Sequence, residues 1–252
     1  MASSFWRINC MILLESPASF GGRGSGIRRP KDLEGRRVGI PEWSQTAGIY
    51  ARGLLQQEYG VDLKSIDWRQ AGVRQAGRIE KVNLRKDLPF RITAMPEHTL
   101  GEMLAKGELD AAISARELPG ERLFADYRSA ELEYFRKTRI FPIMHMIVLR
   151  REAYEQNRWI AMNLFQAFQE AKQRSLERLR EIGISHLPLP WLSDTTRAWQ
   201  EVAGGDFWPY GVEANRPTLE AFLQYAYEQG VCQRRLRVEE LFAPETLSSY
   251  KI

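Results

Sequence analysis

The sequence predicts an α/β protein with a mainly parallel sheet, and three features of the chain point to this class. Short apolar runs alternate with helical patterns between residues 36 and 114. Each run is bounded by glycine, proline or polar residues, which is typical of strands. The chain becomes helical after residue 154. Alternating strands and helices build parallel sheets covered by helices, and 252 residues provide one large or two small domains of this kind.

The first strand, loop and helix follow a short helical turn at residues 30–33. Residues 36–40 are expected to form the strand, which ends at Pro41. Ser44 opens the helix, whose apolar residues recur at helical spacing: Ala47, Tyr50, Ala51, Leu54 and Leu55. We place no core element in residues 1–26, which read as a flexible leader because a Gly/Ser-rich stretch there has no periodic pattern.

A second unit repeats this order up to residue 114. Strands are expected at 66–68 and 91–94, separated by a charged loop that contains glycine. Thr99 then caps a helix, and Glu102 three residues later completes a capping box. The strand at 109–114 follows this helix directly. Open parallel sheets bind ligands at the carboxyl ends of their strands, so the residues that follow the strands are candidates for a site.

The remainder of the chain predicts one more strand and three helices. Residues 140–149 are mostly apolar and predict a second buried strand. A long amphipathic helix is expected at 154–182. Two more helical patterns follow, the second with Pro217 in its first turn and Gly230 just beyond its end.

Composition and charge favour a folded protein that handles small ligands. Lys and Arg (36) exceed Asp and Glu (32) by only four, and the basic runs have acidic neighbours, so nucleic acid is not expected as a partner. No apolar run approaches the roughly 20 residues that cross a bilayer, so no membrane partner is expected. Cys10 and Cys232 read as free thiols, and the apolar run at 11–14 is too short for a signal-peptide core. These features predict a cytoplasmic protein.

The helix start at Ser44, Gln45 and Thr46 is a candidate binding site for an anion. Free N–H groups and the positive end of the helix dipole can hold a carboxylate or phosphate there, and two hydroxyl groups add donors. The alternative is that Ser44 only caps its helix. Arg116 follows the strand at 109–114 and can hold a carboxylate in a bidentate fork, unless it is a solvated loop residue.

Three further residues are candidates for chemistry. His145 lies within an apolar run and can donate or accept a proton, unless it is only a core histidine. Glu42 and Trp43, between the first strand and its helix, offer an acid and an aromatic wall, although a loop glutamate can also be merely solvated. The sequence contains no metal-ligand spacing, nucleotide fingerprint or nucleophile elbow, so we expect no metal, no cofactor and no covalent nucleophile.

Five segments of the chain resemble those of 4,5-dihydroxyphthalate decarboxylases, in the same order and with compatible spacing. The resemblance runs from about residue 26 to the C-terminus. It is carried by residues 32–43 (DLEGRRVGIPEW), 101–111 (GEMLAKGELDA), 140–145 (IFPIMH), 207–213 (FWPYGVE) and 239–244 (EELFAP).

This resemblance implies a fold similar to type II periplasmic solute-binding proteins, with two α/β lobes and the ligand in the cleft between them. After the leader at 1–26, residues 27–135 would form an inserted lobe with crossing segments. Residues 136–252 would supply the strand of the second lobe and the C-terminal helices. Family members carry a longer N-terminal segment, so we expect one lobe to be incomplete and its exposed apolar surface to favour homo-oligomer contacts.

The resemblance also implies a reaction, the non-oxidative decarboxylation of 4,5-dihydroxyphthalate to protocatechuate and CO₂ in phthalate catabolism. The expected partner is then a small aromatic dicarboxylate, and no cofactor is expected. We assign His145 as the acid/base and Glu42 as the partner of the phenol groups, with Trp43 beside the substrate. The clamp for the remaining carboxylate is assigned to Ser44, Gln45, Thr46 and Arg116.

Three alternatives to this reading stay open at the level of the sequence. A solute-binding component of an ABC-type uptake system would share the fold. A decarboxylase of a different aromatic acid would share both the fold and the site residues. An inactive truncated homologue is the third alternative.

Overall fold

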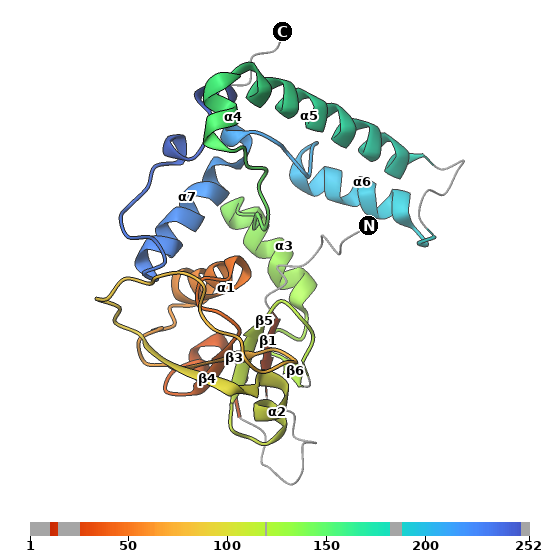
Figure 1. The fold of residues 1–252 in the computed structure, drawn as a ribbon. Coiled ribbons are helices and arrows are strands. Elements are labelled where there is room, and N and C mark those ends of the chain that lie inside the picture. Colours follow the sequence, from red (N-terminus) through yellow and green to blue (C-terminus); the bar gives the residue numbers. More distant parts are fainter. Residues whose placement is uncertain (1–10, 15–25, 119, 182–187, 248–252) are drawn as a thin grey trace. The chain divides into compact units, whose positions relative to one another are not determined.

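The computed structural model describes residues 11–14, 26–118, 120–181 and 188–247 of the chain (Figure 1). The chain is an α/β protein, as the sequence predicts. It divides into two compact units, of which the first comprises residues 1–144 and 220–236 and the second residues 145–219 and 237–252.

The first unit contains a six-stranded sheet with the strand order β4-β3-β2-β5-β1-β6. Its strands are Met11–Leu14 (β1), Arg37–Ile40 (β2), Asp67–Gly72 (β3), Arg91–Thr99 (β4), Ala111–Ser114 (β5) and Glu121–Arg122 (β6). β2 pairs in parallel with β3 and with β5, and β3 pairs in parallel with β4. The four strands predicted before residue 114 are therefore confirmed, and together they form the parallel part of the sheet.

β1 corrects the expectation that residues 1–26 contain no core element. Met11–Leu14 pairs antiparallel with β5, so that Met11 faces Ser114 and Leu14 faces Ala111. Four apolar residues are too short a run to show a strand period, and they form a strand because they pair with β5 on one side and β6 on the other. Residues 1–10 and 15–25 of the expected leader lie outside the described residues.

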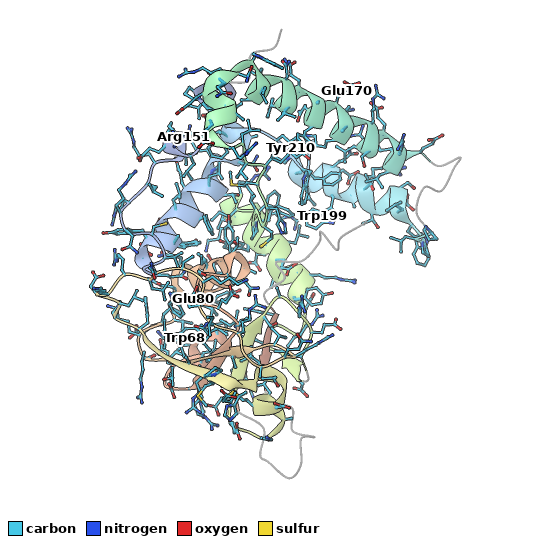
Figure 2. The ribbon with its side chains drawn as sticks, viewed as in Figure 1. Trp68, Glu80, Arg151, Glu170, Trp199 and Tyr210 are labelled. Atoms are coloured by element: carbon cyan, nitrogen blue, oxygen red, sulfur yellow. The ribbon has the colours of Figure 1, made fainter. Side chains whose placement is uncertain are left out.

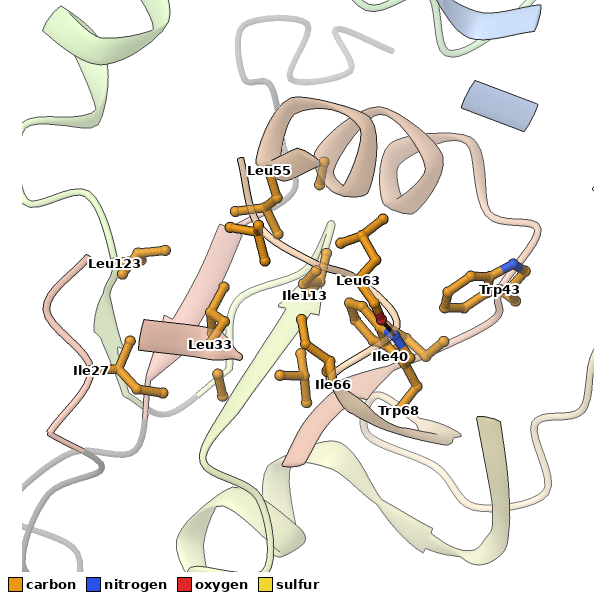
Figure 3. Close-up of a cluster of buried hydrophobic side chains, with 14 of the residues drawn as sticks. Ile27, Leu33, Ile40, Trp43, Leu55, Leu63, Ile66, Trp68, Ile113 and Leu123 are labelled. Carbon is orange, nitrogen blue, oxygen red and sulfur yellow. Dashed lines mark hydrogen bonds between the residues drawn. The ribbon is translucent and has the colours of Figure 1, made fainter. Parts of the chain in front are cut away.

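Helices cover both faces of the sheet. The helices of the first unit are the 3₁₀ helix η1 (Pro30–Leu33), α1 (Thr46–Gln57), α2 (Leu100–Ala105), α3 (Tyr127–Thr138) and the C-terminal part of α7 (Val212–Glu228). Successive side chains of a strand point to opposite faces, so Val38 and Ile40 of β2 share one face with Ile113 of β5. They pack beneath α1 in a core that contains Trp43, Leu55, Leu63, Ile66 and Trp68 (Figure 3).

α2 packs on the opposite face of the sheet. The buried apolar residues of this second core are Ala71, Val73, Leu100, Met103, Leu104, Leu109 and Ala112. Gly39 faces this core, and a side chain there would overlap Leu100 and Leu109. The Thr99 hydroxyl accepts a hydrogen bond from the Glu102 N–H at 3.2 Å, which confirms the predicted helix cap.

The C-terminal part of α7 packs against α1 within the first unit. Tyr50 of α1 lies in a buried cluster with Tyr225 of α7. Gly53 permits the close approach of the two helices, because a side chain there would overlap the Tyr225 ring. Gly230 follows the helix with φ +72°, which is the left-handed conformation that a helix end requires and confirms the predicted stop signal.

The second unit is helical in its described residues. Its helices are α4 (Arg151–Gln156), α5 (Trp159–Arg180), α6 (Leu192–Ala203), the first part of α7, and the 3₁₀ helices η2 (Val238–Glu240) and η3 (Pro244–Thr246). None of the helices in the described part of the chain is long and apolar enough to cross a membrane.

Two helix boundaries in this unit differ from prediction. The single helix expected at 154–182 is interrupted at Asn157, which leaves the helical conformation (φ −143°, ψ 68°). Asparagine does so readily because its side chain competes for backbone hydrogen bonds. Pro217 lies inside α7 rather than in its first turn, because the helix begins earlier, at Val212.

A buried lysine of α5 binds the segment between α6 and α7. Lys172 is 9% exposed, and its Nζ donates to Asp206 Oδ2 at 2.5 Å and to the Trp208 carbonyl at 3.1 Å. The same ammonium lies 4.9 Å from the centre of the Tyr210 ring, which Figure 2 labels. Burial of the cation is therefore offset by an ion pair, a hydrogen bond and an aromatic face.

The buried strand expected at 140–149 does not form. Residues 139–150 have no regular secondary structure, and residues 145–150 are exposed, with Val148 85% and Ile147 61% accessible. A strand requires a hydrogen-bonded neighbour, and no described strand pairs with this segment. The prediction of burial for His145 is wrong for the same reason.

An ion pair fastens the beginnings of β2 and β5. Asp110 accepts from the backbone N–H of Arg37 at 2.8 Å, and from its Nε at 3.0 Å and Nη2 at 2.8 Å. Burial by itself raises the pKa of Asp110, but the hydrogen bonds from Arg37 outweigh it and hold the pKa below its ordinary value of 3.8. The ionised carboxylate is therefore the form that stabilises the fold.

We predict that Asp110→Asn lowers the free energy of unfolding at neutral pH by about 1–3 kcal/mol, the usual cost of losing hydrogen bonds to a charged group. Because the pKa of Asp110 is depressed in the fold, this stabilisation is complete above the ordinary value of 3.8 and is lost as the pH falls through the lower folded value. Urea unfolding followed by circular dichroism across this range is the measurement.

Asp87→Asn is the matched control, since the Asp87 side chain is 74% exposed beside Arg85. The difference in the free energy of unfolding between the wild type and Asp110→Asn should become smaller in acid. A difference that stays constant, or that equals the effect of Asp87→Asn, would contradict the stabilising role of the ionised Asp110 carboxylate.

Candidate functional site

The strand order places a candidate site between β2 and β5. From β2 the chain proceeds to β3 and β4 on one side, and β5 then lies on the other side of β2. In open α/β sheets this reversal leaves a crevice at the carboxyl ends of the two strands, where ligands bind. Glu42, Trp43 and Ser44 follow β2 there, and Arg116 follows β5. Five of the sequence-predicted residues, 42–46, and Arg116 therefore share one edge of the sheet.

The loop just before α1 binds the carboxylate of Glu80, a residue of the same chain. Glu80 Oε2 accepts from the backbone N–H of Trp43 at 2.6 Å and from that of Ser44 at 3.2 Å, and the Ser44 hydroxyl donates to Glu80 Oε1. We call these three donors the carboxylate seat. Two backbone N–H groups of the loop, the Ser44 hydroxyl and the nearby positive end of α1 explain why an anion is stable there. Glu80 lies beside α1 in Figure 2.

Ser44 is not the cap of α1. The helix begins at Thr46, its N-cap residue is Gln45, and no side chain caps it. The alternative interpretation, in which Ser44 only caps its helix, is therefore wrong, and the Ser44 hydroxyl is directed to a carboxylate instead. Substrate binding by Ser44, Gln45 and Thr46 stays a prediction.

Glu42 is a buried carboxylate with cationic partners. It is 7% exposed, and its Oε1 lies 2.7 Å from Arg78 Nε and 3.7 Å from Lys81 Nζ. A buried charge is stable only when it is paired, and the two cations supply this pairing. Arg78 and Lys81 belong to the same short segment as Glu80, and we call residues 78–81 the strap. The strap thus contacts the β2–α1 loop through charges of both signs.

Trp43 contributes its backbone to the seat while its ring lies in the core. The ring is fully buried, and its centre lies 5.3 Å from the centre of the Trp68 ring and 5.1 Å from the centre of the Phe90 ring. Its indole N–H donates to the Gln229 carbonyl at 2.7 Å. Substrate contact through this ring stays a prediction.

The buried side chain of Arg52 supports the loop between β2 and α1. Arg52 has no exposed surface, and its guanidinium lies 3.9 Å from the centre of the Trp43 ring. Its Nη2 donates to the Trp43 carbonyl at 2.5 Å, and its Nε donates to Gln229 Oε1 at 2.8 Å. The Gln229 amide in turn donates to the Ile49 carbonyl at 2.9 Å. These bonds fix the backbone that carries the seat.

The remaining predicted residues have different surroundings. Gln45 Oε1 is a buried acceptor without a hydrogen-bond partner among the described residues. Arg116 is exposed, and its N–H donates to Ser114 Oγ at 3.0 Å. His145 is exposed and belongs to the second unit, whereas the other predicted residues belong to the first. No group of three His, Cys, Asp or Glu side chains in the described part of the chain could hold a metal ion.

The strap is the part of the site that the sequence did not reveal. Glu80 is part of no recognisable motif, and its residue number differs from that of Ser44 by 36. The only signal was that the loop between β3 and β4 is charged. No spacing rule pairs a loop glutamate with a helix start at that distance, so the contact could be found only from the fold.

Two curated proteins that are similar to this chain have the same name. A 4,5-dihydroxyphthalate decarboxylase of Comamonas testosteroni is 35% identical over 237 residues, which cover 90% of this chain and 72% of that protein. A 4,5-dihydroxyphthalate decarboxylase of Pseudomonas putida is 38% identical over 92 residues, which cover 36% of each chain. No protein-family model matches the chain.

We predict that Trp43→Phe lowers the free energy of unfolding by about 2 kcal/mol, because it removes the bond to the Gln229 carbonyl and leaves unfilled volume in the core. Urea unfolding followed by circular dichroism gives this value. Trp159→Phe is the control, since Trp159 is 62% exposed and its replacement is expected to change stability by less than about 0.5 kcal/mol. Equal effects of the two substitutions would show that Trp43 does not anchor the loop.

Proposed function

Because the chain belongs to the 4,5-dihydroxyphthalate decarboxylase family, we propose that it converts 4,5-dihydroxyphthalate into protocatechuate and CO₂. The protein is then a carboxy-lyase of phthalate degradation. The observation that carries this proposal is identity of 35% across 90% of the chain with a decarboxylase of that name.

The substrate itself makes the reaction feasible. Each carboxylate of 4,5-dihydroxyphthalate is para to a hydroxyl group, so removing a proton from that hydroxyl increases the electron density at the carbon that bears the carboxylate. An acid protonates this carbon, the carbon–carbon bond breaks, and its electron pair restores the aromatic ring. CO₂ leaves, and the phenol recovers its proton. The protein must therefore supply a proton donor, a partner for the phenol and a clamp for the remaining carboxylate.

The carboxylate seat supports the proposed clamp. It already binds a carboxylate through two N–H groups and a hydroxyl. We assign the remaining carboxylate of the substrate to Ser44, Gln45 and Thr46, with Arg116 at the end of β5 as the cationic partner.

We assign the proton chemistry to Glu42 and His145. Glu42 directly precedes the seat and is the carboxylate proposed to receive the phenol hydrogen. His145 is the proposed donor to the ring carbon, and its exposed position leaves the imidazole accessible to solvent protons.

We further infer a two-lobed fold of the type II periplasmic-binding-protein kind. The chain leaves the first unit after Met144 and returns to it at Glu220, as expected for lobes built from discontinuous chain. A cytoplasmic location fits the free, partly buried thiol of Cys232. Self-association through the exposed apolar residues at 146–149 is the proposed oligomer contact.

The purified protein is expected to release protocatechuate from 4,5-dihydroxyphthalate, as followed by liquid chromatography. His145→Ala is expected to lower kcat by about 10²- to 10⁴-fold, the range for loss of a general acid–base group. His98→Ala is the matched control, because His98 lies on β4 and no role is assigned to it. It is expected to retain wild-type kcat.

Absence of product from folded protein would contradict the proposed substrate. Equal kcat values for His145→Ala and His98→Ala would instead contradict the role of His145 and leave the reaction standing.

A further inference from the structure

The carboxylate seat is occupied by a side chain that lies on an irregular, largely exposed loop. Glu80 fills all three donors of the seat. The two Ser44 donors among them are also assigned to a substrate carboxylate by the proposed function. One carboxylate cannot bind there while the other remains, so Glu80 and the substrate compete.

The strap is held by charges rather than by apolar burial. Ile79 within it is 66% exposed, and Val82 next to it is 43% exposed. Its fastenings are the contacts of Glu80 with the seat and the ion pairs of Arg78 and Lys81 with Glu42. A segment that buries little apolar surface opens at a lower free-energy cost than the core strands around it. The strap can therefore open while the sheet remains folded.

We propose that Glu80 is an internal competitor for the substrate carboxylate and that opening of the strap is a step of substrate binding. This inference rests on the proposed function, because it names what replaces Glu80. In the free protein Glu80 satisfies the seat, and in the complex the substrate carboxylate does so. The backbone N–H groups are paired in both states, so exchange of one anion for the other leaves no buried donor unsatisfied.

This arrangement makes the site selective for anions. A neutral aromatic cannot offer the seat a carboxylate, so it gains nothing that offsets the loss of Glu80. An aromatic carboxylate regains the same charge-assisted hydrogen bonds. The strap thus lowers affinity for all ligands but lowers it most for ligands without a carboxylate.

The test uses phthalate, which has both carboxylates but lacks the hydroxyl groups that drive decarboxylation. Its dissociation constant is measured by isothermal titration calorimetry for the wild type, Glu80→Gln and Glu97→Gln. Glu97 is an exposed glutamate of β4 and controls for the change in net charge. We expect Glu80→Gln to bind phthalate about tenfold more tightly, since a neutral amide is a weaker competitor for the seat. Glu97→Gln is expected to match the wild type.

Unchanged or weaker phthalate binding by folded Glu80→Gln overturns the inference, and so does a failure of all three proteins to bind phthalate at millimolar concentration. Turnover separates the inference from the proposed function. Tighter phthalate binding without turnover of 4,5-dihydroxyphthalate by the wild type contradicts the function and leaves the strap intact. Turnover with the same KM in the wild type and Glu80→Gln contradicts the strap and leaves the function intact.

Discussion

The geometry of the candidate site depends on the buried guanidinium of Arg52. This cation has no exposed surface, and it is stabilised by the hydrogen bonds of its Nη2 and Nε to the Trp43 carbonyl and Gln229 Oε1 and by the face of the Trp43 ring. Their positions are fixed in return. Trp43 belongs to the loop that carries the seat, and Gln229 directly follows α7. The seat is therefore set by contacts between parts of the chain 177 residues apart.

Much of the first unit could be predicted from the sequence because its signals are local. Thr99 and Glu102 indicate the start of a helix, and Gly230 indicates the end of one. Short apolar runs separated by turns indicate the strands. A helix start has free N–H groups, so an anion site near residues 44–46 could be anticipated, although the seat takes its two N–H donors from Trp43 and Ser44, just before the helix. The side chain that occupies the seat could not be predicted, because Glu80 reaches it through tertiary structure alone.

The two mistaken strand predictions share a different cause. The segment 140–149 has the composition of a buried strand, but composition does not supply the neighbouring strand that would pair with it. Met11–Leu14 illustrates the reverse case, because a run with no strand signal becomes a strand beside the free edge of β5. Strand formation is decided by partners distant in sequence, whereas helix boundaries such as Asn157 are decided locally.

Hydrogen exchange at the backbone N–H groups of the seat measures whether the Arg52 network holds the carboxylate seat in place. Arg52→Lys keeps the charge but cannot reach Trp43 and Gln229 together with a planar group. We expect the N–H groups of Trp43 and Ser44 to exchange at least about tenfold faster in folded Arg52→Lys than in the wild type, while exchange of the Leu104 N–H in α2 is unchanged. Unchanged exchange at Trp43 and Ser44 would show that the seat is held in place without Arg52.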